Sequence, residues 1–247
     1  MNEKKSFLGK IPLNPPLKFR ERAEQGLTLD LIPLQDYLQT VLSVEPLIDA
    51  ATERAPILCK SITSFLSLRA DSLSVNILTK MTEDSEERVR FFAATALDVI
   101  DDNYYDKILG LKLKIKNNPD SVLLHKELGK TYFDFAQLRM QVRVLKNHYL
   151  DRAIKEFNKI LDVESNDTEA LYYKAIAYHF KGDTEKALEI YQKLINYAPD
   201  NCNARFGMAE IYYQQGLYEE VKVQCQNILR IGTSDQELLE IARFWSE

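Results

Sequence analysis

The feature that most constrains the fold of this chain is a pattern that recurs after about 34 residues. Between residues 168 and 201, apolar side chains at helical spacing predict two amphipathic helices. Gly182 separates the two helices and Pro199 ends the second, so this stretch predicts a helical hairpin. A small residue, a tyrosine and a glycine recur in register: Ala175, Tyr178 and Gly182 return as Ala209, Tyr212 and Gly216.

This order of residues resembles the tetratricopeptide repeat, which has the same period. Small side chains at Ala175 and Ala187 let two helix axes approach, while Tyr178 and Tyr191 fill the space beside them. The resemblance implies an all-α fold, a right-handed solenoid of helical hairpins. The predicted tetratricopeptide region, 122–247, consists of repeats 122–167, 168–201 and 202–233 and a capping helix 234–247.

The first repeat carries an insertion. Gly129 and Tyr132 give the signature of a first helix, but Ala153 of the second helix follows Gly129 at twice the regular spacing. Additional residues therefore lie between Phe133 and Tyr149, and we expect a continuous inserted helix there. At the other end of the region, Ser234 and Asp235 can cap a last helix whose Trp245 packs on the final repeat.

Residues 17–102 are helical in pattern but lack the repeat. We expect a helix over 72–81 and, after a capping box of Asp84 and Glu87, a second helix over 89–100. The second helix reads VRxxAAxALxxI and resembles the second helix of a HEAT repeat, in which an aspartate and an arginine often bridge neighbouring repeats. The number of HEAT-like repeats stays open, and a linker helix is expected over 103–121.

Residues 1–16 contain Lys4, Lys5 and Lys10 and three prolines, which predicts a flexible basic arm. The arm is either a solvated tail or a contact for anionic lipid or an acidic partner. The whole chain carries a net charge of −5, which argues against a nucleic-acid partner. Its three cysteines have no metal-ligand spacing and are predicted to be core thiols in a reducing compartment.

Catalytic motifs are missing from the sequence. His125, His148 and His179 belong to no metal-ligand motif, and no phosphate loop or nucleophile elbow occurs. We therefore expect a non-enzymatic protein without cofactors or metals. No apolar run has the length of a membrane span and no signal peptide is found, which predicts a soluble cytoplasmic protein.

A tetratricopeptide array is expected to bind a protein segment on its first helices. The candidate residues are those on the flank of each first helix that faces away from the packing residues. They are Lys126, Lys130, Phe133, Tyr172, Ile176, His179, Phe180, Phe206, Glu210 and Tyr213. This set is rich in aromatic side chains, which indicates that a partner covers them. Alternatively, some of the rings pack on the inserted helix. A lysine and asparagine clamp for a C-terminal carboxylate is incomplete here.

The HEAT-like helix, the linker helix and the enlarged first repeat together resemble the cytoplasmic region of the E proteins (PelE) of the Pel exopolysaccharide system. The resemblance implies a non-catalytic adaptor of a bacterial inner-membrane polysaccharide synthase complex, active in biofilm formation. Its partners would be a cyclic-di-GMP receptor and synthase components, and membrane contact would be peripheral or through these partners.

One departure is that such proteins carry N-terminal transmembrane helices, which are missing here. Either they were removed from a longer parent, or partners dock this chain, or the resemblance misleads. The alternatives are a tetratricopeptide adaptor unrelated to polysaccharide and a HEAT-type lyase, which would need more HEAT copies and a catalytic site. A nucleic-acid-binding HEAT fold comes last because the chain is acidic.

Overall fold

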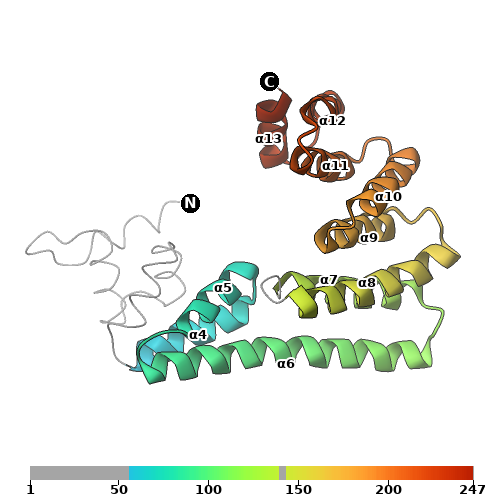
Figure 1. Ribbon diagram of the computed structural model, residues 1–247. Coiled ribbons are helices and arrows are strands. Elements are labelled where there is room, and N and C mark those ends of the chain that lie inside the picture. The colour runs from blue at the N-terminus through green and yellow to red at the C-terminus, as the bar shows by residue number, and fades with distance from the viewer. Residues whose placement is uncertain (1–55, 139–142, 247) are drawn as a thin grey trace, which may run out of the picture. The chain divides into compact units, whose positions relative to one another are not determined.

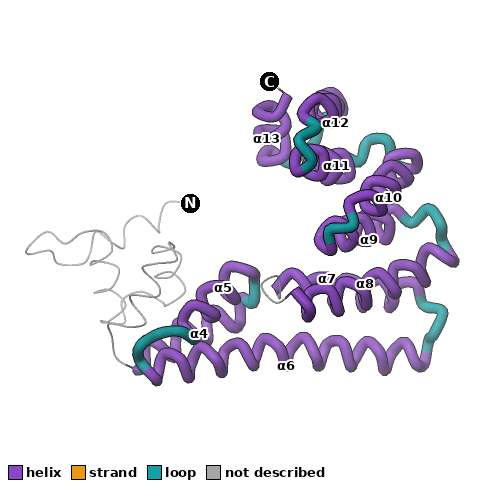
Figure 2. The backbone as a smooth tube through the Cα atoms, viewed as in Figure 1, coloured by secondary structure: helices purple, strands orange, loops and turns teal. Residues whose placement is uncertain are grey.

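The computed structural model describes residues 56–138 and 143–246. Within these residues ten helices follow one another without a strand. Figures 1 and 2 show how the helices follow along the chain. The chain divides into two compact units, Met1–Asn103 and Tyr104–Glu247. The predicted arm 1–16 and residues 17–55 of the predicted HEAT-like region lie outside the described residues.

The first unit contains α4 (Pro56–Arg69), α5 (Ser72–Met81) and the beginning of α6 (Glu87–Asn117). The helix predicted over 72–81 is confirmed as α5, because the side chain of Asp71 accepts a hydrogen bond from the Ser74 amide at its start. Apolar side chains of all three helices are buried, among them Ile62, Leu78 and Ala93.

The start of α6 differs from the predicted capping box. The Asp84 carboxylate accepts from the amide of Glu86, 2.8 Å away, and α6 begins at Glu87. Arg90, the arginine of the HEAT-like string, donates to the backbone carbonyl oxygens of Asp84 and Ser85. The side chain of Arg90 therefore ties down the turn before its own helix.

A separate linker helix over 103–121 is not what the structure shows. The predicted helix 89–100 and the predicted linker are one helix of 31 residues, α6. Asp101 to Asn103 lack a helix-breaking residue, so the backbone hydrogen bonds continue through them. From Tyr104 onward, α6 belongs to the second unit, where Ile108 and Leu111 are buried.

The second unit is a row of helical hairpins in which consecutive helices pack against each other. The helices are α7 (Val122–Leu138), α8 (Arg143–Val163), α9 (Thr168–Lys181), α10 (Thr184–Tyr197), α11 (Cys202–Gln214), α12 (Tyr218–Ile231) and α13 (Gln236–Ser246). The predicted all-α solenoid of helical hairpins is thereby confirmed. The assignment of the two parts to HEAT-like and tetratricopeptide-like domains stays a prediction.

The prediction of a continuous inserted helix is wrong. α7 ends at Leu138, α8 begins at Arg143, and the two helices pack side by side as a hairpin. The additional residues lengthen both helices: α7 has 17 residues and α8 has 21, whereas α9 and α10 have 14 each. Apolar residues at helical spacing fit a lengthened hairpin as well as a single helix, so the pattern did not distinguish them.

Capping side chains and a glycine mark the helix ends. Asp167 caps α9 by accepting from the amide of Ala170, and Gly182 ends this helix with a positive φ of 86° that favours glycine. Asp235 caps α13 by accepting from the amide of Leu238, as predicted. These signals place the hairpin turns, so each helix presents its small and aromatic residues to the next.

The predicted packing residues are buried in the second unit. Ala175, Ala187, Tyr191 and Leu194 belong to one apolar cluster, and Ala209, Val221, Cys225 and Ile228 belong to the next. All three cysteines are buried free thiols, as predicted. Close approach requires a glycine in α7: a Cβ at Gly129 would lie 2.7 Å from the ring of Phe157 in α8.

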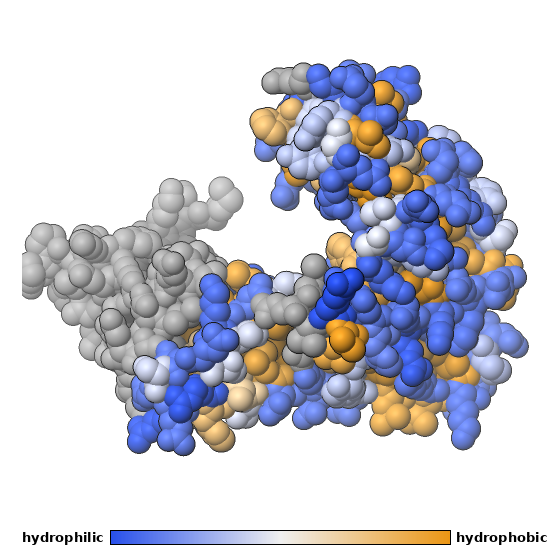
Figure 3. Space-filling model, viewed as in Figure 1, coloured by the Kyte–Doolittle hydropathy of each residue, from blue (hydrophilic) through white to orange (hydrophobic). Residues whose placement is uncertain are grey.

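On the face that Figure 3 shows, polar and apolar residues are mixed over the described helices, drawn as blue and orange atoms. None of the helices described here combines the length and apolar character that a bilayer span requires.

Candidate functional site

The first helices of the three hairpins, α7, α9 and α11, together line a cavity of about 420 Å³, which we call the groove. Seven of the ten candidate residues predicted from the sequence line it. They are Phe133, Tyr172, Ile176, His179, Phe180, Phe206 and Glu210. Because these side chains come from helices far apart in sequence, packing of the repeats is what brings them together.

Lys126 and Lys130 of the candidate set do not line the groove. The ammonium of Lys126 lies 2.7 Å from Asp167 and 3.1 Å from Glu169, and Lys130 pairs with Glu169. Burial alone would raise the pKa of Asp167, but the hydrogen bond from Lys126 lowers it below its usual value. Both lysines thus join α7 to the start of α9.

The third candidate outside the groove, Tyr213, contacts the last helix of the chain with one face of its ring, while 51% of its surface stays exposed. Its ring stacks on Trp245 of α13 with centroids 5.1 Å apart. Phe206 stacks on the same indole, with centroids 5.6 Å apart. The prediction that Trp245 packs on the last repeat is confirmed, and its indole contacts one face of two rings that the sequence assigned to partner binding.

Phe133 contributes one wall of the groove but is itself buried, with 3% of its surface exposed. Its ring stacks on Phe180 at 5.8 Å and meets Tyr173 edge-on at 5.4 Å. The alternative that rings pack inside the protein therefore holds for Phe133. Its neighbours, however, belong to α9 and not to an inserted helix.

Glu210 of α11 is the half-buried carboxylate of the groove. Burial raises the pKa of its carboxyl above the usual value, and the nearby His179 partly offsets that rise. His179 lies 3.3 Å from the amide oxygen of Gln214, measured from Nε2. Burial also raises the pKa of Tyr172, which sits beside Glu210. The groove therefore contains a partly buried acidic group.

Six lining residues were missed by sequence reasoning: Asp134, Gln137, Tyr173, Tyr191, Asn203 and Gly207. A signal existed for five of them. Each lies three or four residues from a member of the predicted set and so shares its helix face; they are Asp134, Gln137, Tyr173, Asn203 and Gly207. Tyr191 was assigned to packing alone, yet its hydroxyl end reaches the groove beside Gly207, where a Cβ would lie 2.5 Å from Oη.

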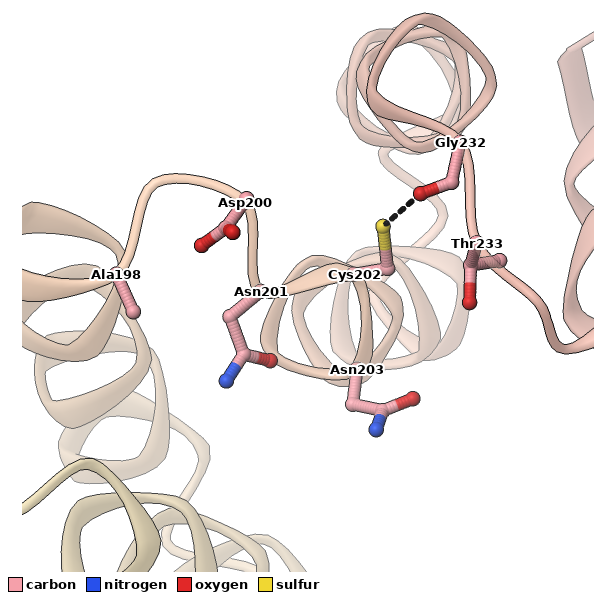
Figure 4. Close-up of a pocket in the computed structure, with 7 residues that line it drawn as sticks. All are labelled: Ala198, Asp200, Asn201, Cys202, Asn203, Gly232 and Thr233. Carbon is pink, nitrogen blue, oxygen red and sulfur yellow. Dashed lines mark hydrogen bonds between the residues drawn. The ribbon is translucent and has the colours of Figure 1, made fainter.

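Two smaller cavities lie near the turns. One, of about 340 Å³, is shown in Figure 4 and is lined by polar residues such as Asp200, Asn201 and Thr233. Cys202 Sγ donates to the carbonyl oxygen of Gly232, 3.6 Å away, and so ties the turn after α12 to the start of α11. The side chains of this cavity form no catalytic arrangement.

The other cavity, of about 250 Å³, contains His125. His125 Nδ1 lies 2.6 Å from a carboxylate oxygen of Glu156, and Nε2 lies 2.8 Å from the carbonyl oxygen of Pro119. With only 7% of its surface exposed, His125 joins α8 to the turn before α7. No cluster of three or more metal-ligating side chains occurs among the described residues.

Comparison with known proteins agrees with this geometry. The tetratricopeptide repeat family matches residues 181–240, which run from the end of α9 into α13. The TPR repeat-containing protein MJ1428 of Methanocaldococcus jannaschii is 27% identical, over 35% of this chain and 21% of its own length. This chain thus spans about a fifth of that curated relative.

Among solved structures, the TPR protein TTC0263 of Thermus thermophilus superimposes with a TM-score of 0.51 and 15% identity. The superposition covers 75% of this chain and 98% of TTC0263. At this identity the likeness concerns the fold alone. The family match places tetratricopeptide repeats in residues 181–240, and the fold likeness agrees with it.

Proposed function

We propose that this protein is an adaptor whose groove holds a segment of a partner protein. The observation that carries the proposal is a set of partly exposed side chains on neighbouring first helices that line one cavity. They are Tyr172, Ile176, His179, Phe180 and Phe206. Removal of large aromatic side chains from water is favourable, so a partner that covers them gains binding energy. Such side chains contribute most of the binding energy at many protein interfaces.

The form of the groove supports binding without a large conformational change. Its walls are helices held by buried clusters, such as the one around Tyr191 and Leu194. A preformed site loses little conformational entropy when it binds, so more of the contact energy appears as affinity. A cavity of about 420 Å³ accommodates a few side chains of a peptide.

The experiment that tests this proposal places a photo-crosslinking amino acid in the groove, at Ile176, in the protein expressed in its own host. The matched control places it at Val223 of α12, an aliphatic residue that is 52% exposed and does not line the groove. We expect a partner protein to be crosslinked from Ile176 and not from Val223. Equal crosslinking from both positions would show that the groove is not the binding surface.

A second measurement uses substitutions and the partner identified by crosslinking. Tyr172→Ala should weaken its binding at least about tenfold, because truncation of an aromatic hot spot costs about 2 kcal/mol or more. Tyr197→Ala is the control, since Tyr197 is half-exposed on α10 outside the groove. Circular dichroism on both variants verifies that they remain helical. An affinity reduced equally by the two substitutions would argue against the groove.

At a finer level, we propose that the partners belong to a Pel-like exopolysaccharide synthase complex at the bacterial inner membrane. The adaptor would then be cytoplasmic and non-catalytic and would link a cyclic-di-GMP receptor to the synthase. The sequence resemblance and the lengthened first hairpin, with 21 residues in α8, support this assignment. If the proteins crosslinked from Ile176 include no synthase component or receptor, the adaptor serves another assembly.

A further inference from the structure

We propose that the groove selects a lysine or arginine side chain of its partner, which the Glu210 carboxylate binds between aromatic rings. This inference rests on the proposed function of the groove and adds the chemistry of the partner. It follows from the charge of the groove, the environment of Glu210, the pairing of the nearby lysines and the orientation of the rings.

The charge of the groove has one sign. Asp134 of α7 and Glu210 of α11 both line it, whereas no lysine or arginine is found among its described lining residues. His179 is the only basic side chain among them. An acidic cavity attracts cationic groups and repels carboxylates.

Glu210 is only partly exposed, and it forms no hydrogen bond or ion pair with the residues that the structure describes. It faces His179 and Tyr172 of α9 and Tyr191 of α10. A half-buried carboxylate has lost part of its hydration, and a partner cation restores the favourable electrostatic interaction. This is why binding of a cation at Glu210 is favoured over binding of a neutral side chain.

Burial raises the pKa of the Asp134 carboxyl, and Lys107 and Lys130 lie close enough to offset part of that rise. No described lysine, however, is directed to Glu210. Lys126 and Lys130 are directed to Asp167 and Glu169 at the start of α9. They are therefore not available to hold an acidic peptide. The cation must come from the partner.

The aromatic rings add a second attraction for a cation. A ring of this unit already binds a cation within the chain, because Lys130 Nζ lies 5.2 Å from the centroid of Tyr173. Tyr172 and Phe206 line the groove together with Glu210 and can contact the alkyl stem or the charged end of a bound side chain. A carboxylate beside aromatic faces is the combination that lysine and arginine prefer.

The experiment screens the whole chain against a display library of random short peptides. Enriched peptides are synthesised and titrated against the wild type, Glu210→Gln and the matched control Glu240→Gln, a glutamate of α13 outside the groove. Tyr172→Ala is titrated in parallel to report whether the peptide occupies the groove. In each peptide, lysine and arginine are also replaced by the uncharged analogues norleucine and citrulline.

We expect the enriched peptides to contain lysine or arginine next to an apolar residue. Glu210→Gln and the uncharged analogues should each weaken binding at least about tenfold, and Glu240→Gln should leave it unchanged. When both changes are combined, the loss should not be additive, because they remove the same ion pair.

Two outcomes would overturn the inference, and they differ in what they say about the groove. If peptides bind in a Tyr172-dependent manner but contain no basic residue, or bind Glu210→Gln as well as the wild type, the groove is a binding site without this selectivity. If no peptide is enriched, or all bind independently of Tyr172, the proposed function of the groove fails as well.

Discussion

The indole of Trp245 stacks on the phenol ring of Tyr213 with centroids 5.1 Å apart and planes inclined by only 2°. The same indole stacks on Phe206. The last helix of the chain therefore covers the end of the third hairpin, and its Leu238 and Ala242 belong to the apolar cluster of α11 and α12. Substitutions at Phe206 or Tyr213 consequently disturb α13 as well as the candidate binding surface.

Since Trp245 is the only tryptophan, its fluorescence reports this contact alone. Tyr213→Ala should shift the emission maximum to longer wavelength, because the indole loses a stacked ring and gains contact with water. Tyr197→Ala, half-exposed on α10, serves as the control and should leave the spectrum unchanged. Identical spectra for all three proteins would mean that the stacked arrangement is not maintained in solution.

Substitution by alanine should change the free energy of unfolding in opposite directions at Gly207 and Gly110. A Cβ at Gly207 would lie 2.5 Å from Tyr191 Oη, so Gly207→Ala should lower the free energy of unfolding by about 1–3 kcal/mol. A Cβ at Gly110 of α6 meets no atom within 4 Å, so Gly110→Ala should raise it by about 0.5–1 kcal/mol. Urea titrations followed by circular dichroism measure both.

The interpretation of Gly207→Ala can be tested by a double-mutant cycle. If the destabilisation comes from the contact with Tyr191, it should largely disappear in a Tyr191→Ala background, where the ring is missing. An undiminished effect in that background would locate the strain elsewhere.

The ion pair of Lys126 with Asp167 should make stability depend on pH in the acidic range. Lys126 lowers the pKa of Asp167 in the folded state, so the pair stabilises the protein above the unfolded pKa of about 3.9. This stabilisation is lost as the pH falls through the lowered pKa of the folded state. Asp167→Asn keeps a capping side chain for α9 and should reduce stability near neutral pH by about 1 kcal/mol.

Chemical denaturation of the wild type and Asp167→Asn at several acidic pH values measures the difference in stability between the two proteins. This difference should vanish at the lowest pH. Asp235→Asn is the matched control, since Asp235 also caps a helix but forms no ion pair with a described residue. A difference that stays constant with pH would mean that the charge of Asp167 contributes little.

The buried cysteines should react slowly in the folded protein. Burial raises the pKa of Cys225 to about 11 and also raises the pKa values of Cys59 and Cys202. Because the thiolate is the reactive form, alkylation by iodoacetamide at pH 8 should be at least about tenfold slower than in urea. Mass spectrometry of the labelled peptides gives the rate at each position.

The same labelling experiment can test the role of α13. Cys202 and Cys225 belong to the apolar cluster on which Trp245 packs, whereas Cys59 belongs to the first unit. Trp245→Ala should therefore accelerate labelling of Cys202 and Cys225 and leave Cys59 unchanged. Equal acceleration at Cys59 would indicate a global loss of stability instead.

The sequence by itself determined those structural features that depend on residues within one or two helical turns. The ends of α5 and α9, the cap at Asp235 and the burial of Ala175 and Tyr191 all follow from capping residues and helical periodicity. The recurrence of the repeat extends this local information to the hairpin fold, because each repeat packs on the next in the same way. The candidate groove residues could be selected on this basis.

Only the tertiary structure decided which of those residues remain open to a partner. Lys126 pairs with Asp167, 41 residues away, and Trp245 reaches back over Tyr213. Gly207 lets Tyr191 into the groove. Whether α7 and α8 form one long helix or a hairpin also depends on the packing of α7 on α8. Such contacts depend on the crossing angles between packed helices. These angles result from the packing of many side chains from both helices, and no local sequence pattern determines them.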